Sequence, residues 1–120
     1  MSRPLLFCAA LLAGAVFALL SGASAANAAS FDCNAESLKP DEKAICDNRD
    51  LNDADVRMVT TFDLLSGFLA MGSRSALQDE QVAWLKTRQA CEADIDCLKA
   101  AYAARMAQFS AVVDKIERPL

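Results

Sequence analysis

The 120-residue chain contains no histidine, and it has only four glycines and three prolines. Without histidine it lacks the usual general base, the Ser-His and Cys-His nucleophile pairs, and imidazole metal ligands. These groups serve much of hydrolytic chemistry, so we expect a protein that is not an enzyme. After residue 28 only Gly67, Gly72, Pro40 and Pro119 remain. A β-sandwich or barrel needs many more turn residues, and the sequence therefore favours a mainly helical domain.

The N-terminal segment has the pattern of an export signal. Residues 5–20, LLFCAALLAGAVFALL, form an apolar run behind Arg3, and small residues follow. This order is typical of a secretory signal peptide, and Ala26-Asn27-Ala28 provides an A-x-A cleavage site. A membrane anchor is the alternative, because about 17 apolar residues are enough to span a bilayer, but no basic stop-transfer cluster follows. We expect residues 1–28 to be a signal peptide and residues 29–120 to form one domain.

Cleavage removes Cys8 and leaves Cys33, Cys46, Cys91 and Cys97. Four cysteines in an exported chain predict two disulfides, with three possible pairings, of which proximity favours Cys33 with Cys46 and Cys91 with Cys97. A helix rises about 9 Å over six residues, farther than a disulfide reaches, so the second pairing requires a helix break. The spacings do not suit a zinc site, and we expect no metal or other cofactor.

One short and one long helix are expected between residues 40 and 71. Pro40 suits the first turn of the short helix, which ends near Asp47. A break and a new cap within 48–52 precede the long helix, which runs to about Met71. Its predicted buried face comprises Leu51, Asp55, Met58, Phe62, Leu65 and Leu69.

Two further long helices follow. Gly72 and Ser73 are expected to end the preceding helix, and Ser75 with Gln78 resembles a capping box for the next. The buried stripe of that helix comprises Leu77, Gln81, Trp84, Leu85 and Arg88. The last helix ends near Glu117, with a stripe of Leu98, Tyr102, Arg105, Phe109, Val112 and Ile116. The predicted fold class is all-α: a small antiparallel bundle of three long helices plus a short N-terminal helix, with two disulfides.

Three charged residues, Asp55, Arg88 and Arg105, fall within these apolar stripes. An unpaired buried charge is costly, so we expect an internal ion pair between Asp55 and either Arg88 or Arg105 that fixes the helix register. The alternative is a functional role, in which Asp55, Trp84 and Arg88 form a partly open recognition surface.

The rest of the charge suggests a kind of partner. Loss of Arg3 with the signal changes the net charge from −4 to −5. Nucleic acids and anionic membranes are poor partners for such a surface, and a basic protein is a better one. Paired catalytic carboxylates are not indicated, because the acids are interpreted as residues of first helical turns and exposed faces: Asp41, Glu42, Asp79, Glu80, Asp94 and Asp96.

The four cysteines belong to a larger pattern of residues along the chain: Phe31-Asp32-Cys33, Glu42, Ile45-Cys46, Leu51, Asp55, Gln81, Trp84-Leu85, Arg88, Cys91, Cys97-Leu98, Tyr102 and Arg105. In this set the chain resembles the LprI-type lysozyme inhibitor family of small exported bacterial proteins. The similarity covers about residues 31–109, and its most specific element is Q-x-x-W-L-x-x-R-x-x-C, which ends at Cys91. Ala54 departs from the Leu that is usual in the family, and Phe62 from a frequent Tyr.

The resemblance implies a periplasmic or secreted binding protein that blocks a muramidase by presenting acidic or polar side chains at the substrate cleft. C-type lysozymes are basic, so the negative charge of the chain would speed the encounter. A structural or adaptor module of the cell envelope, which binds another envelope protein or peptidoglycan, is the alternative. Neither function requires a membrane contact after signal cleavage.

Overall fold

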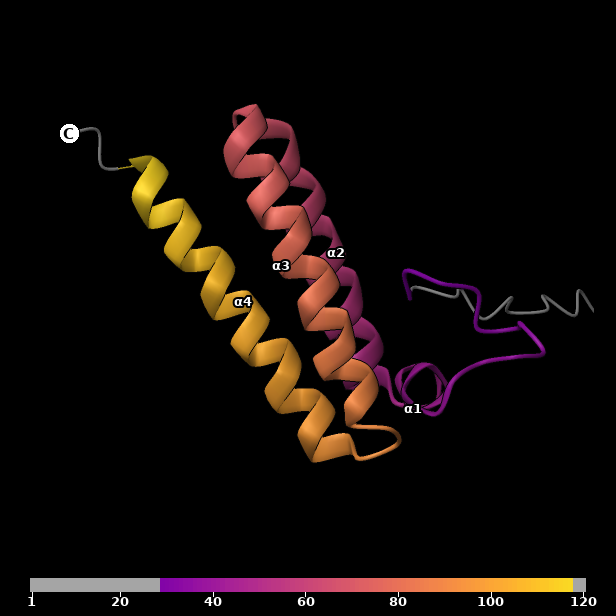
Figure 1. Ribbon diagram of the computed structural model, residues 1–120. Coiled ribbons are helices and arrows are strands. Elements are labelled where there is room, and N and C mark those ends of the chain that lie inside the picture. Colours follow the sequence, from indigo (N-terminus) through magenta and orange to yellow (C-terminus); the bar gives the residue numbers. More distant parts are fainter. Residues whose placement is uncertain (1–28, 118–120) are drawn as a thin grey trace, which may run out of the picture.

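The computed structural model describes residues 29–117, which form four helices joined by short connections (Figure 1). The helices are α1 (Pro40–Asp47), α2 (Arg49–Phe68), α3 (Met71–Ala90) and α4 (Ile95–Glu117). No strand occurs among residues 29–117, and the predicted all-α class is confirmed. The predicted signal peptide, residues 1–28, lies outside the described residues.

The first two helices begin where the sequence indicates. Pro40 occupies the first turn of α1, and the Glu42 carboxylate accepts the backbone N–H of Lys39 at 2.9 Å. Asn48 separates α1 from α2, and its side-chain oxygen accepts the N–H of Leu51 at 3.2 Å. These bonds satisfy amide donors that a first helical turn leaves without partners.

The three long helices lie side by side and bury their predicted stripes against one another (Figure 1). Because the stripes recur at the helical period, one face of each helix supplies the core while the opposite face stays polar. Ile116, which was predicted to be buried, is 51% exposed because α4 leans away from the other two helices toward its C-terminal end. The apolar core consists of Ala44, Ile45, Leu51, Met58, Leu65, Leu77, Trp84, Cys91, Leu98, Ala101, Tyr102 and Phe109.

Both predicted disulfides are present. The Cα atoms are 5.7 Å apart in Cys33–Cys46 and 5.5 Å apart in Cys91–Cys97. As expected, the helix breaks inside the second loop, where α3 ends at Ala90 and α4 begins at Ile95. The disulfides lie at the end of the bundle that carries α1 and the α3–α4 turn, called here the stapled end. Such bonds indicate an oxidising, extracytoplasmic compartment.

The turn between α2 and α3 differs from the prediction. α2 ends at Phe68 and α3 already begins at Met71, so Gly72, Ser73 and Ser75 lie inside α3 instead of ending one helix and capping the next. The chain reverses at Leu69, a partly buried residue that packs against the core. Arg74 stabilises this turn, because its guanidinium donates to the Leu69 carbonyl at 3.0 Å.

Candidate functional site

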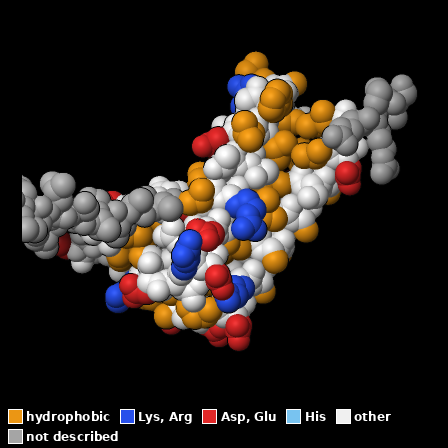
Figure 2. Space-filling model, turned by 180° about the vertical axis from the view of Figure 1, so that it is seen from behind, with side chains coloured by type: hydrophobic (Ala, Val, Ile, Leu, Met, Phe, Trp, Pro, Cys, Tyr) orange, Lys and Arg blue, Asp and Glu red, His pale blue; other side chains and the backbone are white. Residues whose placement is uncertain are grey.

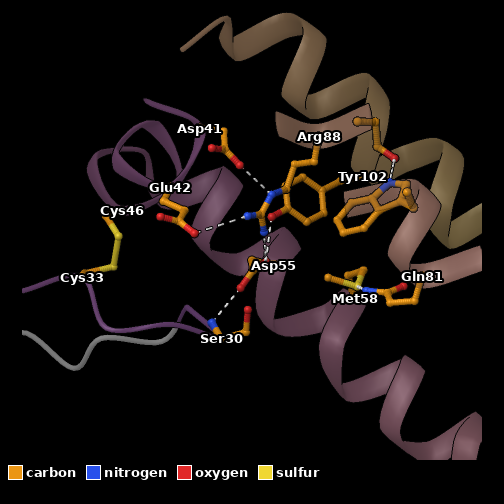
Figure 3. A network of polar contacts seen from close by, with 12 residues as sticks. Ser30, Cys33, Asp41, Glu42, Cys46, Asp55, Met58, Gln81, Arg88 and Tyr102 are labelled. Atoms are coloured by element: carbon orange, nitrogen blue, oxygen red, sulfur yellow. Dashed lines mark hydrogen bonds and ion pairs between the residues drawn. A yellow bond between two sulfur atoms is a disulfide. The ribbon is translucent and has the colours of Figure 1, made fainter. Parts of the chain in front are cut away.

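A buried ion-pair network joins α1, α2 and α3 at the stapled end (Figure 3). Arg88 Nε donates to Asp41 Oδ2 at 2.9 Å, and Arg88 Nη1 lies 3.7 Å from Asp55 Oδ1. The side chains of Arg88, Asp41 and Asp55 are 4%, 1% and 0% exposed. The predicted pairing of Asp55 with Arg88 is therefore confirmed, although Arg88 makes its shorter contact with Asp41.

Neutral donors complete the environment of Asp55. The Tyr102 hydroxyl of α4 donates to Oδ1 at 2.7 Å, and the backbone N–H of Ser30 donates to Oδ2 at 2.7 Å (Figure 3). Burial and the Asp55 carboxylate raise the pKa of Tyr102 well above its ordinary value, so this hydroxyl remains a donor. The buried network thus connects all four helices and the segment that precedes α1.

Asp41 of this network differs from the sequence prediction. The prediction puts it in an exposed first turn, but it is 1% exposed and supplies the closest carboxylate to Arg88. A signal for its burial was present, because Asp41, Ala44 and Ile45 follow the i, i+3, i+4 spacing of one helix face. Its neighbour Glu42 lies 3.9 Å from Arg88 through Oε1.

Arg105 belongs to a separate cluster, so of the two partners expected for Asp55 the structure supplies Arg88. Its Nε donates to Gln81 Oε1 at 2.9 Å and its Nη2 to the Leu77 carbonyl at 3.3 Å. The guanidinium also lies 3.5 Å from Glu80 and 4.4 Å from the centre of the Phe109 ring. Burial lowers the pKa of Arg105, while Glu80 acts in the opposite direction.

Trp84 packs between the two charged clusters. Its indole N–H donates to the Ala101 carbonyl at 2.9 Å, and its ring meets the Tyr102 ring edge-on at 5.2 Å between centroids. The Arg88 guanidinium lies 6.0 Å from the Trp84 ring and 5.5 Å from the Phe31 ring. Trp84 therefore binds α3 to α4 while it also lines one side of the Arg88 site.

The structure thus brings Asp55, Trp84 and Arg88 together, and it buries all three. As whole residues they are 0%, 6% and 3% exposed, so they do not offer a face to a protein partner in this conformation. Direct contact with a partner has to come from exposed side chains elsewhere.

The opposite end of the bundle exposes a cluster of large apolar side chains (Figure 2). We call it the apolar tip; it consists of Leu64 (58% exposed), Phe68 (80%), Met71 (81%) and Ile116 (51%). Grooves run along both sides of the last turns of α4. The groove against α2 is lined in part by Leu65 and Val113, and the groove against α3 by Leu77 and Val112. Clustered exposed apolar side chains of this kind mark interaction sites.

Carboxylates outnumber cations around the apolar tip. Residues 61–79 and 109–116 form this end of the bundle, and they carry three acidic and two basic residues: Asp63, Asp79 and Asp114 against Arg74 and Lys115. An apolar centre within a polar, charged border is the usual anatomy of a protein interface. No sequence pattern indicates this site, because Phe68, Met71 and Ile116 have the spacing of ordinary residues on helix faces or at helix ends.

Neither a membrane span nor a metal site is found in the part of the chain that the structure describes. No helix there is long and apolar enough to cross a membrane. No group of three or more His, Cys, Asp or Glu side chains among residues 29–117 is placed to hold a metal ion.

The fold and the two ends define the class of this protein: a disulfide-bonded helical bundle with a charged core at one end and an exposed apolar tip at the other. No protein-family model, curated protein or solved structure matches the chain.

Proposed function

We propose that this chain is an exported bacterial binding protein that inhibits a muramidase by docking its apolar tip at the enzyme's substrate cleft. The observation that carries the proposal is the tip itself, whose Phe68 and Met71 side chains are 80% and 81% exposed at the α2–α3 turn. The resemblance to the LprI-type inhibitors supports the choice of enzyme, and the two disulfides support an extracytoplasmic site of action.

Charged and apolar side chains are expected to contribute differently to binding. The excess of carboxylates favours approach to a basic enzyme such as a C-type lysozyme, and this attraction acts mainly on the association rate. Aromatic and long apolar side chains that become fully desolvated commonly supply most of the binding energy in an interface. Phe68 and Met71 are therefore the expected anchors, while the acidic border attracts and orients the enzyme.

The first experiment titrates the disulfide-bonded chain, residues 29–120, against C-type lysozyme in a cell-wall lysis assay at low salt. We expect inhibition at a micromolar or lower concentration, weakened as added salt screens the charges. An absence of inhibition at micromolar excess contradicts the proposal. Capture of one endogenous envelope protein, with no effect on lysozyme, would instead favour the adaptor function.

The second experiment locates the contact surface with matched substitutions. Phe68→Ser is expected to raise the inhibition constant at least about tenfold, because it removes a desolvated anchor. Val82→Ser is the control, since Val82 is also an exposed apolar residue of the bundle, 56% exposed, but lies eleven residues along α3 from Met71, or about 16 Å. An equal effect of both substitutions, or none of Phe68→Ser, would show that the tip is not the contact surface.

Substitution of a buried residue tests whether the buried network contributes to binding or only to stability. Asp55→Asn is expected to lower stability while the folded fraction keeps its affinity for the enzyme, because Asp55 is 0% exposed. Unchanged stability with lost binding would instead assign Asp55, Trp84 and Arg88 to the recognition surface.

A further inference from the structure

The buried network has more acidic groups than basic ones. Asp41 and Asp55 are 1% and 0% exposed, and among residues 29–117 Arg88 is the only cation within 4.0 Å of either. Arg88 also faces Glu42, whose side chain is 21% exposed. Buried carboxylates without a matching cation are costly. A second positive charge close to these groups would therefore stabilise the fold.

Of the two carboxylates, Asp55 is the one without a close cationic donor. Arg88 hydrogen-bonds Asp41 at 2.9 Å but stays 3.7 Å from Asp55. The close donors to Asp55 are both neutral: the Tyr102 hydroxyl from α4 and the Ser30 N–H, each at 2.7 Å. Among residues 29–117, no cation therefore approaches Asp55 from the side of Ser30.

Ser30 is preceded by Ala29, a partly buried residue that packs against the core. Consecutive Cα atoms are about 3.8 Å apart. The backbone nitrogen of Ala29 is therefore close to the Ser30 nitrogen, which already donates to Asp55. In the unprocessed chain this nitrogen belongs to a neutral amide. The predicted signal cleavage site lies at the same bond, between Ala28 and Ala29.

We propose that export processing supplies the missing cation: the α-amino group released at Ala29 pairs with Asp55 and completes the buried network. A leader peptidase hydrolyses the Ala28–Ala29 amide bond with one water molecule. The water oxygen becomes part of the Ala28 carboxylate, and the Ala29 nitrogen gains hydrogen and becomes an ammonium group at neutral pH. The processed chain is thereby more stable than the same chain with an amide at Ala29. This inference rests on the export that the proposed function includes, but not on muramidase binding.

The test compares disulfide-bonded chains that start at Ala29 with a free or an acetylated amino group. Acetylation restores the neutral amide of the precursor while it changes no side chain. We expect it to lower the folding equilibrium constant at least about tenfold, which corresponds to about 1.4 kcal/mol. Denaturant unfolding followed by circular dichroism measures this difference. Equal stability of the two chains would overturn the inference.

Two substitutions assign the effect to Asp55. In Asp55→Asn, acetylation is expected to change the folding constant less than about twofold, because the partner charge is gone. Asp32→Asn is the control, since Asp32 is an exposed carboxylate close to Ala29 in sequence, and there the tenfold effect should persist. The same response in both variants would contradict a specific pair with Asp55.

A chemical readout covers the case in which Asp55→Asn does not fold. At pH 7 the free α-amino group of the folded chain should react with an acylating reagent at least about tenfold more slowly than in denaturant, because the paired ammonium is held protonated. Equal rates contradict the proposal, as does an exported chain whose N-terminal residue, read by mass spectrometry, is not Ala29. Failure of the lysozyme titration would leave these outcomes unchanged, so the two proposals fail separately.

Discussion

Replacement of Arg88 by Met tests whether the buried network stabilises the bundle. Methionine fills much of the same volume but removes the guanidinium, which lies 2.9 Å from Asp41 and 3.7 Å from Asp55; the whole Arg88 side chain is 4% exposed. Both carboxylates then remain buried without the cation that faces them. Loss of one partner from a buried ion pair costs about 3–5 kcal/mol, because the desolvated charge is left uncompensated.

That magnitude is a large part of the 5–15 kcal/mol that typically stabilises a single domain. Denaturant unfolding of the disulfide-bonded chain, followed by far-ultraviolet circular dichroism, measures it. The control is Arg49→Met, because the Arg49 side chain is 92% exposed and its ion pair with Asp53 is 4.0 Å long. We expect a change within about 0.5 kcal/mol there. A loss below about 1 kcal/mol for Arg88→Met would refute the reasoning.

A second substitution separates charge from packing. In the Arg88→Met background, Asp41→Asn removes the carboxylate that Arg88 contacts most closely and keeps its shape. We expect the double variant to recover part of the lost stability, because an amide costs less to bury than an ionised carboxylate. If the two losses simply add, the cost of Arg88→Met comes from packing and not from charge.

Three further predictions follow from single side chains. Tyr102 is the only tyrosine, and its pKa is raised in the folded chain, so the unfolded chain loses the hydroxyl proton first, near pH 10. The free energy of unfolding should therefore fall above that pH. Phenolate absorbance should appear only on unfolding. Glu92 has φ of 50°, where glycine is favoured, so Glu92→Gly should raise the free energy of unfolding by up to about 1 kcal/mol. Trp84→Phe removes the donor to Ala101 and should cost about 1–3 kcal/mol in denaturant unfolding.

Much of the helical architecture could be predicted because its signals are local. Pro40 and Asn48 mark helix starts, and the structure places both at the start of α1 and α2. The stripes of the long helices recur every three or four residues, so each helix presents one face to the core. Short sequence separations also made the two local disulfides the favoured pairing, and the structure contains both.

The α2–α3 turn shows where local signals failed. Gly72 and Ser75 are typical of helix ends and caps, but both lie within α3 in the structure. Ala70 occupies the N-cap position without a side-chain bond, and the turn is held instead by the core contact of Leu69 and by the guanidinium of Arg74. Tertiary packing thus outweighed propensities that amount to about 1 kcal/mol per residue.

The candidate sites were predictable to different degrees. Asp55 and Arg88 stood out because a charge inside an apolar stripe needs a partner, and the structure pairs them. The choice of Asp41 as the closer partner depends on how α1 crosses the bundle, which no local pattern contains. The apolar tip depends on the separation of α4 from the other helices, so Phe68 and Ile116 could not be recognised as exposed from their spacing.

The disulfides and the buried ion pairs lie at one end of the bundle, and this explains why the other end is the apolar tip. Both disulfides, α1 and the buried network hold the helices together at the stapled end, where α4 meets α3 through the six-residue step from Cys91 to Cys97. Toward the tip, α4 has no covalent link to its neighbours within residues 29–117, and it leans away from them (Figure 1). At that end Phe68 and Ile116 stay exposed. Stability is therefore concentrated at one end, which leaves the other end available for a partner to cover.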